Sequence, residues 1–186
     1  IYEVPLKMHQ QHLDEIVLTK TGLPINGEPH LEPWLNFLHR MKNATKTVRI
    51  GLVGKYVELP DAYKSINESL FQAATYNDRK LDLQYIHSEK LNSGNVDAML
   101  SSLDGVLIAP GFGQRGIEGK FIALKYAREH DIPTFGVCLG MQCMVIEYAR
   151  DVLGYTDANS TEMEVSTSHN VIDLMESQKS ISNMGG

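Results

Sequence analysis

The sequence predicts an α/β fold: a doubly wound, mostly parallel sheet with helices on both faces. From Thr45 onward, short β-branched or apolar runs alternate with amphipathic helical patterns. This alternation implies crossover connections, which parallel strands require. In such sheets the working site lies beyond the carboxyl ends of the strands, so the strand-to-helix turns are the first places to search for chemistry. The 186 residues are 42% hydrophobic and 22% charged, which suits one soluble globular domain with an appendage.

The first part of the chain, residues 1–44, is expected to be a tail and linker. Its short apolar groups are broken by prolines, and it contains one helix-like piece, residues 32–41. Pro33 suits a first helical turn. The apolar residues of this piece fall on one helical face: Trp34, Phe37, Leu38 and Met41.

The second part, residues 45–186, carries the α/β pattern. Its expected strands are residues 47–54, 80–86, 103–109 and 133–138, of which the last two are predicted to be buried. Its expected helices are residues 62–76, 119–130 and 140–153. No internal repeat or low-complexity segment interrupts this order.

Charge and composition exclude several classes of function. With 23 acidic and 17 basic side chains the net charge is −6, so we expect no nucleic-acid partner. No apolar run of about 18 residues exists, and the first residues lack the layout of a signal peptide, so we expect a cytoplasmic protein without membrane contact. The chain begins at Ile1 and stops at Gly186 after a polar stretch, which we interpret as an excerpt. Two cysteines without partners at ligand spacing predict neither a metal site nor a disulfide.

The turn after the strand at residues 133–138 has the pattern Gly-x-Cys-x-Gly, formed by Gly136, Cys138 and Gly140. Such a turn is typical of a nucleophile elbow, in which small residues allow a strained turn that projects the nucleophile above the sheet. The positive end of the following helix favours a thiolate. Cys138 is therefore the candidate nucleophile, with a buried structural cysteine as the alternative. Cys143, one turn further on, is predicted to pack in the core.

A second turn, the glycine-rich loop at residues 110–116, follows the strand at residues 103–109. An oxyanion hole needs one amide from the residue after the nucleophile, here Leu139, and one from a neighbouring loop that approaches closely. Gly111 and Phe112 are placed to supply the second amide. The loop differs from the dinucleotide fingerprint Gly-x-Gly-x-x-Gly, which belongs at a first strand. Its residues 113–116 are a candidate lid.

These motifs carry a family resemblance. The string at residues 136–142 resembles the nucleophile motif of class I glutamine amidotransferases, whose catalytic triad is a cysteine with a downstream His-x-Glu. Strings at residues 53–65, 115–120 and 158–162 resemble the CTP synthase family within that class. The opening Ile-Tyr-Glu-Val-Pro resembles the end of that family's synthetase domain. The resemblance thus assigns residues 1–44 to the end of the synthetase domain and the interdomain linker. It assigns residues 45–186 to the first two-thirds of the amidotransferase domain.

The resemblance implies that L-glutamine is hydrolysed to glutamate and ammonia. In that family the synthetase domain uses ATP and Mg²⁺ to phosphorylate the uracil oxygen of UTP. Ammonia then displaces that phosphate, which gives CTP. The resemblance places the ATP, Mg²⁺ and UTP sites outside this segment, so no cofactor is expected here. It further implies GTP as an activator, and a homotetramer formed largely through the synthetase domain.

The resemblance also implies residue roles. Cys138 would form a glutamyl thioester, and the amides of Gly111 and Leu139 would form the oxyanion hole. Gln142 and Glu162 would hold the amino-acid end of glutamine. The full implied glutamine-binding set is Gly111, Leu139, Gly140, Met141, Gln142 and Glu162.

Two departures from the family pattern stand out. No His-x-Glu follows Cys138: His169 is followed by Asn170, and the His-x-Glu at residues 87–89 precedes the nucleophile and is predicted to be a polar strand exit. Because proton transfer to the leaving ammonia needs a base, we expect this chain alone not to turn over glutamine. In the glycine-rich loop, Pro110 stands where the family has glycine, which removes one amide donor.

The sequence is also compatible with three other functions. The chain could belong to an amidotransferase that serves another acceptor, such as guanine nucleotide or carbamoyl phosphate synthesis. It could be a non-catalytic α/β binding module with an inert elbow. It could also be a cysteine hydrolase or isomerase on a related sheet.

Overall fold

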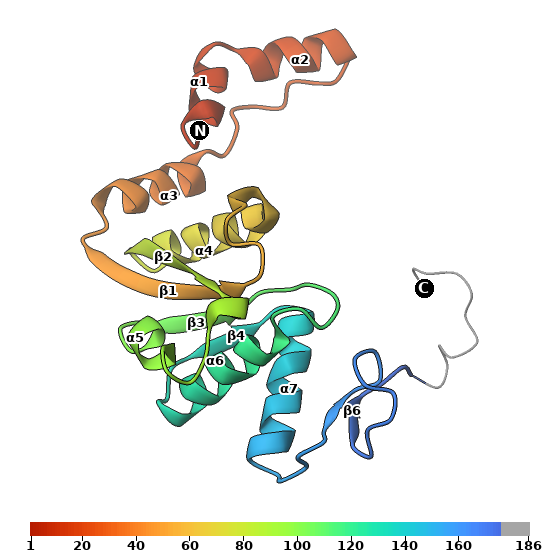
Figure 1. The fold of residues 1–186 in the computed structure, drawn as a ribbon. Helices are drawn as coiled ribbons and strands as arrows, with labels where there is room; N and C mark the ends of the chain where they lie inside the picture. Colours follow the sequence, from red (N-terminus) through yellow and green to blue (C-terminus); the bar gives the residue numbers. More distant parts are fainter. Residues whose placement is uncertain (176–186) are drawn as a thin grey trace. The chain divides into compact units, whose positions relative to one another are not determined.

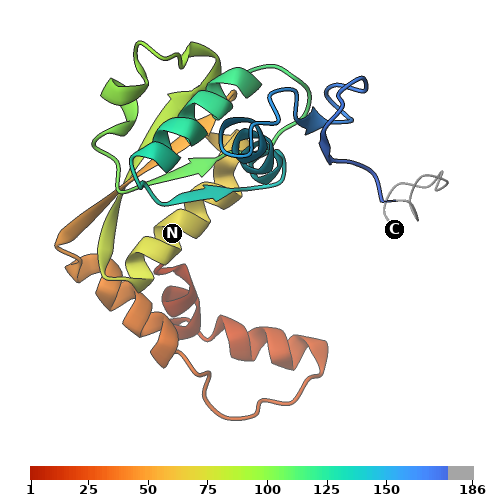
Figure 2. The ribbon, with the colours of Figure 1, turned by 90° about the horizontal axis from the view of Figure 1, so that it is seen from below.

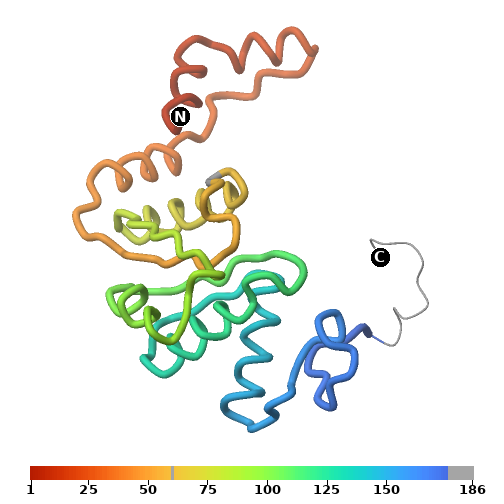
Figure 3. The backbone as a smooth tube through the Cα atoms, in the orientation of Figure 1, coloured from red at the N-terminus to blue at the C-terminus, as the bar shows by residue number. Residues whose placement is uncertain are grey.

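A computed structural model describes residues 1–175 (Figure 1). Its α-helices are α1 (Val4–Gln10), α2 (Leu13–Thr21), α3 (Glu32–Asn43), α4 (Lys64–Tyr76), α5 (Val96–Leu100), α6 (Ile117–Glu129) and α7 (Leu139–Asp151). Its strands are β1 (Lys46–Gly54), β2 (Arg79–His87), β3 (Gly105–Ile108), β4 (Thr134–Gly136), β5 (Asn159–Ser160) and β6 (Asn170–Ile172). Two 3₁₀ turns, η1 (Pro60–Tyr63) and η2 (Ser88–Lys90), complete the elements, and Figure 3 traces the chain through them.

The main sheet has the strand order β2-β1-β3-β4. β3 pairs in parallel with β1 on one side and with β4 on the other, and Ile108 lies opposite both Val53 and Gly136. β5 and β6 form a separate parallel pair. Because parallel strands end at the same sheet edge, the segments that follow β1, β3 and β4 emerge together.

The chain divides into two compact units. Residues 1–47 with 67–81 form the first, and residues 48–66 with the described chain from residue 82 to residue 175 form the second. The core of the second unit is built on β3, whose four residues are all buried. Helices α6 and α7 lie side by side and both pack against β4 (Figures 1 and 2). This packing places the start of α7 at the carboxyl ends of the central strands.

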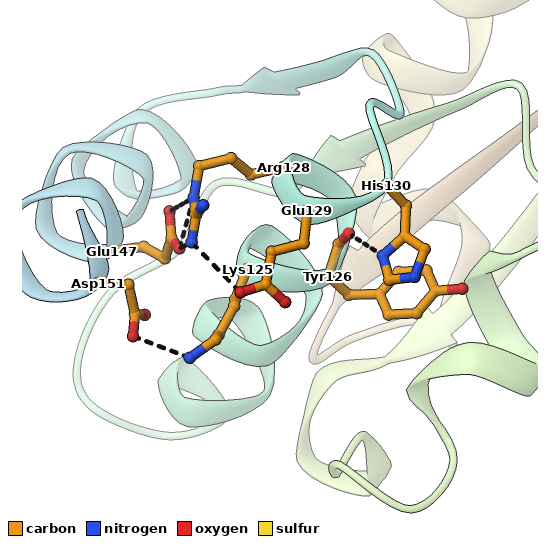
Figure 4. Close-up of polar contacts among 7 residues, drawn as sticks. All are labelled: Lys125, Tyr126, Arg128, Glu129, His130, Glu147 and Asp151. Atoms are coloured by element: carbon orange, nitrogen blue, oxygen red, sulfur yellow. Dashed lines mark hydrogen bonds and ion pairs between the residues drawn. The ribbon is translucent and has the colours of Figure 1, made fainter.

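Polar contacts also join α6 to α7 (Figure 4). The Arg128 guanidinium group donates to both carboxylate oxygens of Glu147. Nη2 and Nε donate to Oε1 at 2.7 Å and 3.0 Å, and Nε also donates to Oε2 at 3.3 Å. Glu147 is only 3% exposed, and its carboxylate raises the pKa of Arg128. A second pair, Lys125 with Asp151 at 3.0 Å, is more exposed. The buried bidentate pair is the stronger constraint on the two helices.

The first unit is held by an aromatic cluster formed by Tyr2, Trp34, Phe37 and Phe71, with ring centroids 5.1 to 6.5 Å apart. The indole Nε1 of Trp34 donates to the carbonyl oxygen of Tyr2 at 2.9 Å. Burial, with a hydrogen bond to Glu68, raises the pKa of Tyr2 to about 12. The four residues predicted to share one helical face all turn inward in α3: Leu38 is buried, and Trp34, Phe37 and Met41 are half-buried.

The structure corrects several expectations. Residues 1–44 contain three helices rather than the one expected. The sequence did not reveal α1 and α2, because both are short, bury no residue and have little apolar periodicity. The five-residue helix α5 and the pair β5–β6 were also not predicted. The strand at residues 133–138 was expected to be buried, but Phe135 is 66% exposed. β4 is the last strand in the order of the described sheet, so no strand of residues 1–175 lies beyond it.

No helix within residues 1–175 is long and apolar enough to span a bilayer.

Candidate active site

The turn between β4 and α7, here called the elbow (residues 136–140), has the strained backbone of a projected nucleophile. Cys138 has φ +53° and ψ −114°, a conformation that residues other than glycine rarely adopt. Its side chain is exposed, one residue before the first residue of α7. The strained backbone thus presents the thiol to solvent at the amino end of a helix.

The two glycines of the elbow are required by close packing of backbone against backbone. A Cβ atom on Gly140 would lie 2.2 Å from the carbonyl oxygen of Ile108. A Cβ atom on Gly136 would lie 2.5 Å from the carbonyl carbon of Gly140. The start of α7 therefore rests directly on β3 and β4, and no larger residue fits at either position.

The glycine-rich loop lies beside the elbow. The amide of Val137 donates to the Ile108 carbonyl at 3.1 Å, which continues the β3–β4 pairing to the point where both chains leave the sheet. A Cβ atom placed on Gly111 would lie 3.8 Å from Cδ2 of Leu139. The two residues predicted to donate to an oxyanion are therefore neighbours.

The amide of Leu139 is available for such a role. Leu139 is the first residue of α7, and the first amides of a helix have no intrahelical acceptor. The free amide of Leu139 and the helix dipole favour negative charge at this end of α7. Cys138, Leu139 and Gly111 thus combine a thiol with a local environment that suits an anion.

Two side-chain hydrogen bonds hold the loops around this turn. Nζ of Lys55, which follows β1, donates to the carbonyl oxygen of Phe112 at 2.5 Å. Nε2 of Gln114 donates to the carbonyl oxygen of Met163 at 2.6 Å. Met163 belongs to the turn at residues 161–164, which we call the Glu162 turn. The second contact therefore ties the Glu162 turn to the glycine-rich loop.

The remaining predicted glutamine-binding residues lie on these segments. The amide of Gln142 donates to the carbonyl of Cys138 at 3.2 Å, so Gln142 stands one helical turn above the nucleophile and is half-buried. Met141 is 48% exposed. Glu162 is exposed, and its amide donates to Oγ of Ser160 at 3.2 Å.

The second cysteine has a different environment. Cys143 has no exposed surface and belongs to the hydrophobic core, as predicted. Burial raises the pKa of its thiol to about 11. At neutral pH this thiol is protonated and enclosed, so Cys138 is the accessible thiol of the two.

The two histidines considered from the sequence have other partners. His87 closes the turn after β2, where its Nδ1 accepts from the amide of Glu89 at 3.2 Å. His169 binds Asp157 through Nδ1 at 2.5 Å and stacks on Tyr155 with ring centroids 4.4 Å apart. Among the described residues, no cluster of three or more His, Cys, Asp or Glu side chains is arranged to bind a metal ion.

Comparison with known proteins agrees with this geometry. The family profile described as "Glutamine amidotransferase class-I" matches residues 58–184. The chain belongs to the class I glutamine amidotransferase family. The match contains the elbow, the glycine-rich loop and the Glu162 turn.

Individual relatives narrow the comparison. A CTP synthase of Bacteroides fragilis is 66% identical over 186 residues, which is all of this chain and 35% of that protein. A CTP synthase of Porphyromonas gingivalis is 61% identical over the same length and 34% of its own. The chain therefore spans about a third of the length of these curated relatives. Among solved structures, the Trypanosoma brucei CTPS glutaminase domain with bound acivicin is 40% identical, with a TM-score of 0.66 over 72% of this chain and 52% of that one.

These matches confirm the class I amidotransferase fold predicted from the sequence. Sequence reasoning missed two side chains that hold the loops beside the elbow, Lys55 and Gln114. Lys55 lies inside the string at residues 53–65, but neither its contact nor that of Gln114 has a local signature, because each partner is far along the chain. Both are tertiary contacts.

Proposed function

We propose that this chain is the glutamine-hydrolysing part of a CTP synthase and supplies ammonia for the ATP-dependent amination of UTP to CTP. The strained, exposed Cys138 beside Gly111 and the free amide of Leu139 carries the glutaminase part of the proposal. Identity of 54% to 66% to CTP synthases along the whole chain supports the choice of acceptor. The same identity disfavours two alternatives, an amidotransferase that supplies ammonia to another acceptor and a non-catalytic binding module.

The chemistry follows from the elbow. The Cys138 thiolate attacks the side-chain amide carbon of glutamine, and the carbonyl π electrons move to its oxygen. The amides of Leu139 and Gly111 stabilise the resulting oxyanion. Collapse of this intermediate breaks the C–N bond, the nitrogen takes up a proton and leaves as ammonia, and a glutamyl thioester remains. Water then hydrolyses the thioester to glutamate and returns the free thiol.

Substrate binding is assigned to the residues around the elbow. The carboxylate of Glu162 suits the α-ammonium group of glutamine, and Gln142 stands on the same side of α7 as Cys138. Gly140 and Met141 complete the binding set through the first turn of the helix. The Gln114 contact to the Glu162 turn supports this assignment, because it keeps the turn beside the glycine-rich loop.

The wider organisation is part of the same proposal. Residues 1–44 are assigned to the end of a synthetase domain and the linker, and residues 45–186 to the amidotransferase domain. The synthetase domain would bind UTP and ATP with Mg²⁺, form the homotetramer and transmit activation by GTP. A cytoplasmic location follows from these soluble substrates.

The base of the reaction is assigned to a His-x-Glu outside this chain, because the His-x-Glu at residues 87–89 is engaged in a turn. Without a group that protonates the leaving nitrogen, the 186-residue chain should release no ammonia from glutamine. Ammonia release measured with a coupled dehydrogenase assay checks this, and turnover that depends on Cys138 would contradict it.

The proposal as a whole is tested in the full-length protein that contains this chain. Cys138→Ala should abolish CTP formation from glutamine but preserve CTP formation from added ammonium chloride. The matched control is Cys143→Ala, which changes the other cysteine and should retain both activities. Glutamine-dependent CTP formation by the Cys138→Ala protein would refute the role of Cys138. If the wild-type protein forms no CTP from either nitrogen source, the assignment of UTP as the acceptor is refuted.

A further inference from the structure

Lys120 is a lysine in an unusual place. It lies in α6 and is 2% exposed, and it is the largest of the fully buried side chains in the described structure. Its Nζ donates to the carbonyl oxygen of Ala109 at 2.7 Å. Within residues 1–175 no carboxylate forms an ion pair with it. Burying an ammonium group without a counter-ion is unfavourable, so this position calls for a reason beyond core packing.

The acceptor of this hydrogen bond indicates the reason. Ala109 follows the last residue of β3, and its amide donates to the carbonyl of Val53 at 2.9 Å. Its carbonyl is the last backbone group before Pro110 and Gly111. Because Pro110 has no amide hydrogen, it cannot anchor the loop by donating. The loop is therefore fixed at this end through a carbonyl group, and Lys120 supplies the donor.

A second lysine anchors the other side of Gly111. Lys55 donates to the carbonyl oxygen of Phe112 at 2.5 Å. The carbonyl before Pro110–Gly111 and the carbonyl after it are thus each held by an ammonium group, one buried and one partly exposed. This arrangement restricts the direction in which the Gly111 amide points.

We propose that Lys120 is a positioning residue for glutamine hydrolysis: through the Ala109 carbonyl it holds the glycine-rich loop so that the Gly111 amide faces the oxyanion formed at Cys138. This inference rests on the proposed function and adds a residue to it. Burial lowers the pKa of the Lys120 ammonium group; electrostatic interactions with Cys143 and Cys138 oppose that shift, and the charge of Lys55 adds to it.

A role in packing alone predicts a different outcome from a positioning role. Lys120→Met keeps an unbranched apolar side chain of similar length and removes both the charge and the donor. If the lysine only fills space, removing the buried charge should leave activity unchanged. If it positions the loop, the substitution weakens an interaction that matters chiefly when the oxyanion forms, so kcat should fall while KM for glutamine stays nearly constant.

The experiment measures ammonia release from glutamine by the full-length protein that contains this chain, as wild type, Lys120→Met and Lys125→Met. Lys125 lies on the same helix but is exposed and paired with Asp151, so it is the matched control. Loss of one direct oxyanion donor costs about 100-fold or more in kcat. An indirect anchor should cost roughly tenfold, with KM changed less than about twofold. Lys125→Met should match the wild type.

The thermal midpoint of each variant, measured alongside, separates misfolding from loss of positioning. A Lys120→Met protein with an unchanged midpoint and reduced kcat supports the inference. Wild-type kcat in Lys120→Met overturns it, as does a raised KM with unchanged kcat. If the midpoint falls, Lys120→Gln, which retains a donor, is compared at a temperature where both variants are folded. Failure of Lys120→Gln to recover any kcat relative to Lys120→Met then counts against the inference. If the wild type itself releases no ammonia, the proposed function has failed rather than the role of Lys120.

Discussion

The elbow and the glycine-rich loop meet at the same sheet edge but are held in place by different forces. The elbow is fixed by backbone packed on backbone, with Gly140 against the Ile108 carbonyl. The glycine-rich loop is fixed by side-chain hydrogen bonds. Lys120 donates to the carbonyl that precedes the loop, Lys55 donates to the Phe112 carbonyl within it, and Gln114 donates outward to Met163. The conformation of the elbow should therefore be disrupted by larger side chains at its glycines. The conformation of the loop should be disrupted by removal of the side chains that donate hydrogen bonds.

The largest effect is expected at the elbow. Gly140→Ala places a methyl group 2.2 Å from the Ile108 carbonyl oxygen, a backbone atom that cannot turn away. We expect the free energy of unfolding to fall by about 3 kcal/mol or more. Urea unfolding of the chain measures it.

The control for this substitution is Gly113→Ala in the loop. Gly113 has φ +68°, and a Cβ atom added to it would have no neighbouring atom within 4 Å, so only backbone strain opposes the change. The loss should be about 1–2 kcal/mol. Equal losses at the two glycines would remove the distinction between a packed turn and an anchored loop.

The contacts between α6 and α7 test whether the elbow depends on polar anchors as well. Glu147→Ala removes the buried carboxylate and leaves Arg128 without its bidentate partner. We expect a loss of about 2 kcal/mol, below that of a fully buried pair because Arg128 is partly exposed. Asp151→Ala, which breaks the more exposed pair with Lys125, should cost less than about 1 kcal/mol. A larger effect at Asp151 in urea unfolding would contradict this ranking.

A smaller, local effect is expected at Gln114. Gln114→Ala removes the bond to the Met163 carbonyl, which is worth about 1 kcal/mol. Because the contact joins two surface loops, global stability should hardly change. Hydrogen exchange at residues 161–164 should become faster. Gln72→Ala, at an exposed position of α4, is the control, and unchanged exchange in the Gln114 variant would show that the tether does not order the Glu162 turn.

The smallest effect is expected at Asp157, a partly exposed residue of the segment after α7 that pairs with His169. Hydrogen bonds from His169 and the Ser168 amide lower the pKa of Asp157 from 3.8 to about 2. A carboxyl group whose folded pKa is depressed stabilises the fold above its unfolded pKa, and this contribution is lost as the pH falls from about 4 to about 2. The difference in thermal midpoint between wild type and Asp157→Asn should therefore shrink between pH 5 and pH 3. A difference independent of pH would contradict this account.

The parts of this structure that the sequence predicted are those with a local signature. β3 is a continuous apolar run, and Gly-x-Cys-x-Gly marks the elbow within five residues. The burial of Lys120 could not be predicted, because a lysine in a helical pattern is normally solvated, and its acceptor is set by how α6 packs on β3. The exposure of Phe135 was missed for a related reason: burial of an apolar strand depends on which elements cover it. The tether from Gln114 to Met163 joins residues 49 positions apart, beyond any local pattern.

The most direct test of the central claim is covalent labelling of the full-length protein with 6-diazo-5-oxonorleucine, a glutamine-like electrophile, followed by peptide mapping by mass spectrometry. One modification per chain is expected, at Cys138; free glutamine should suppress it, and Cys143 should stay unmodified. An unmodified Cys138, or labelling that glutamine does not suppress, would contradict a glutamine pocket at the elbow.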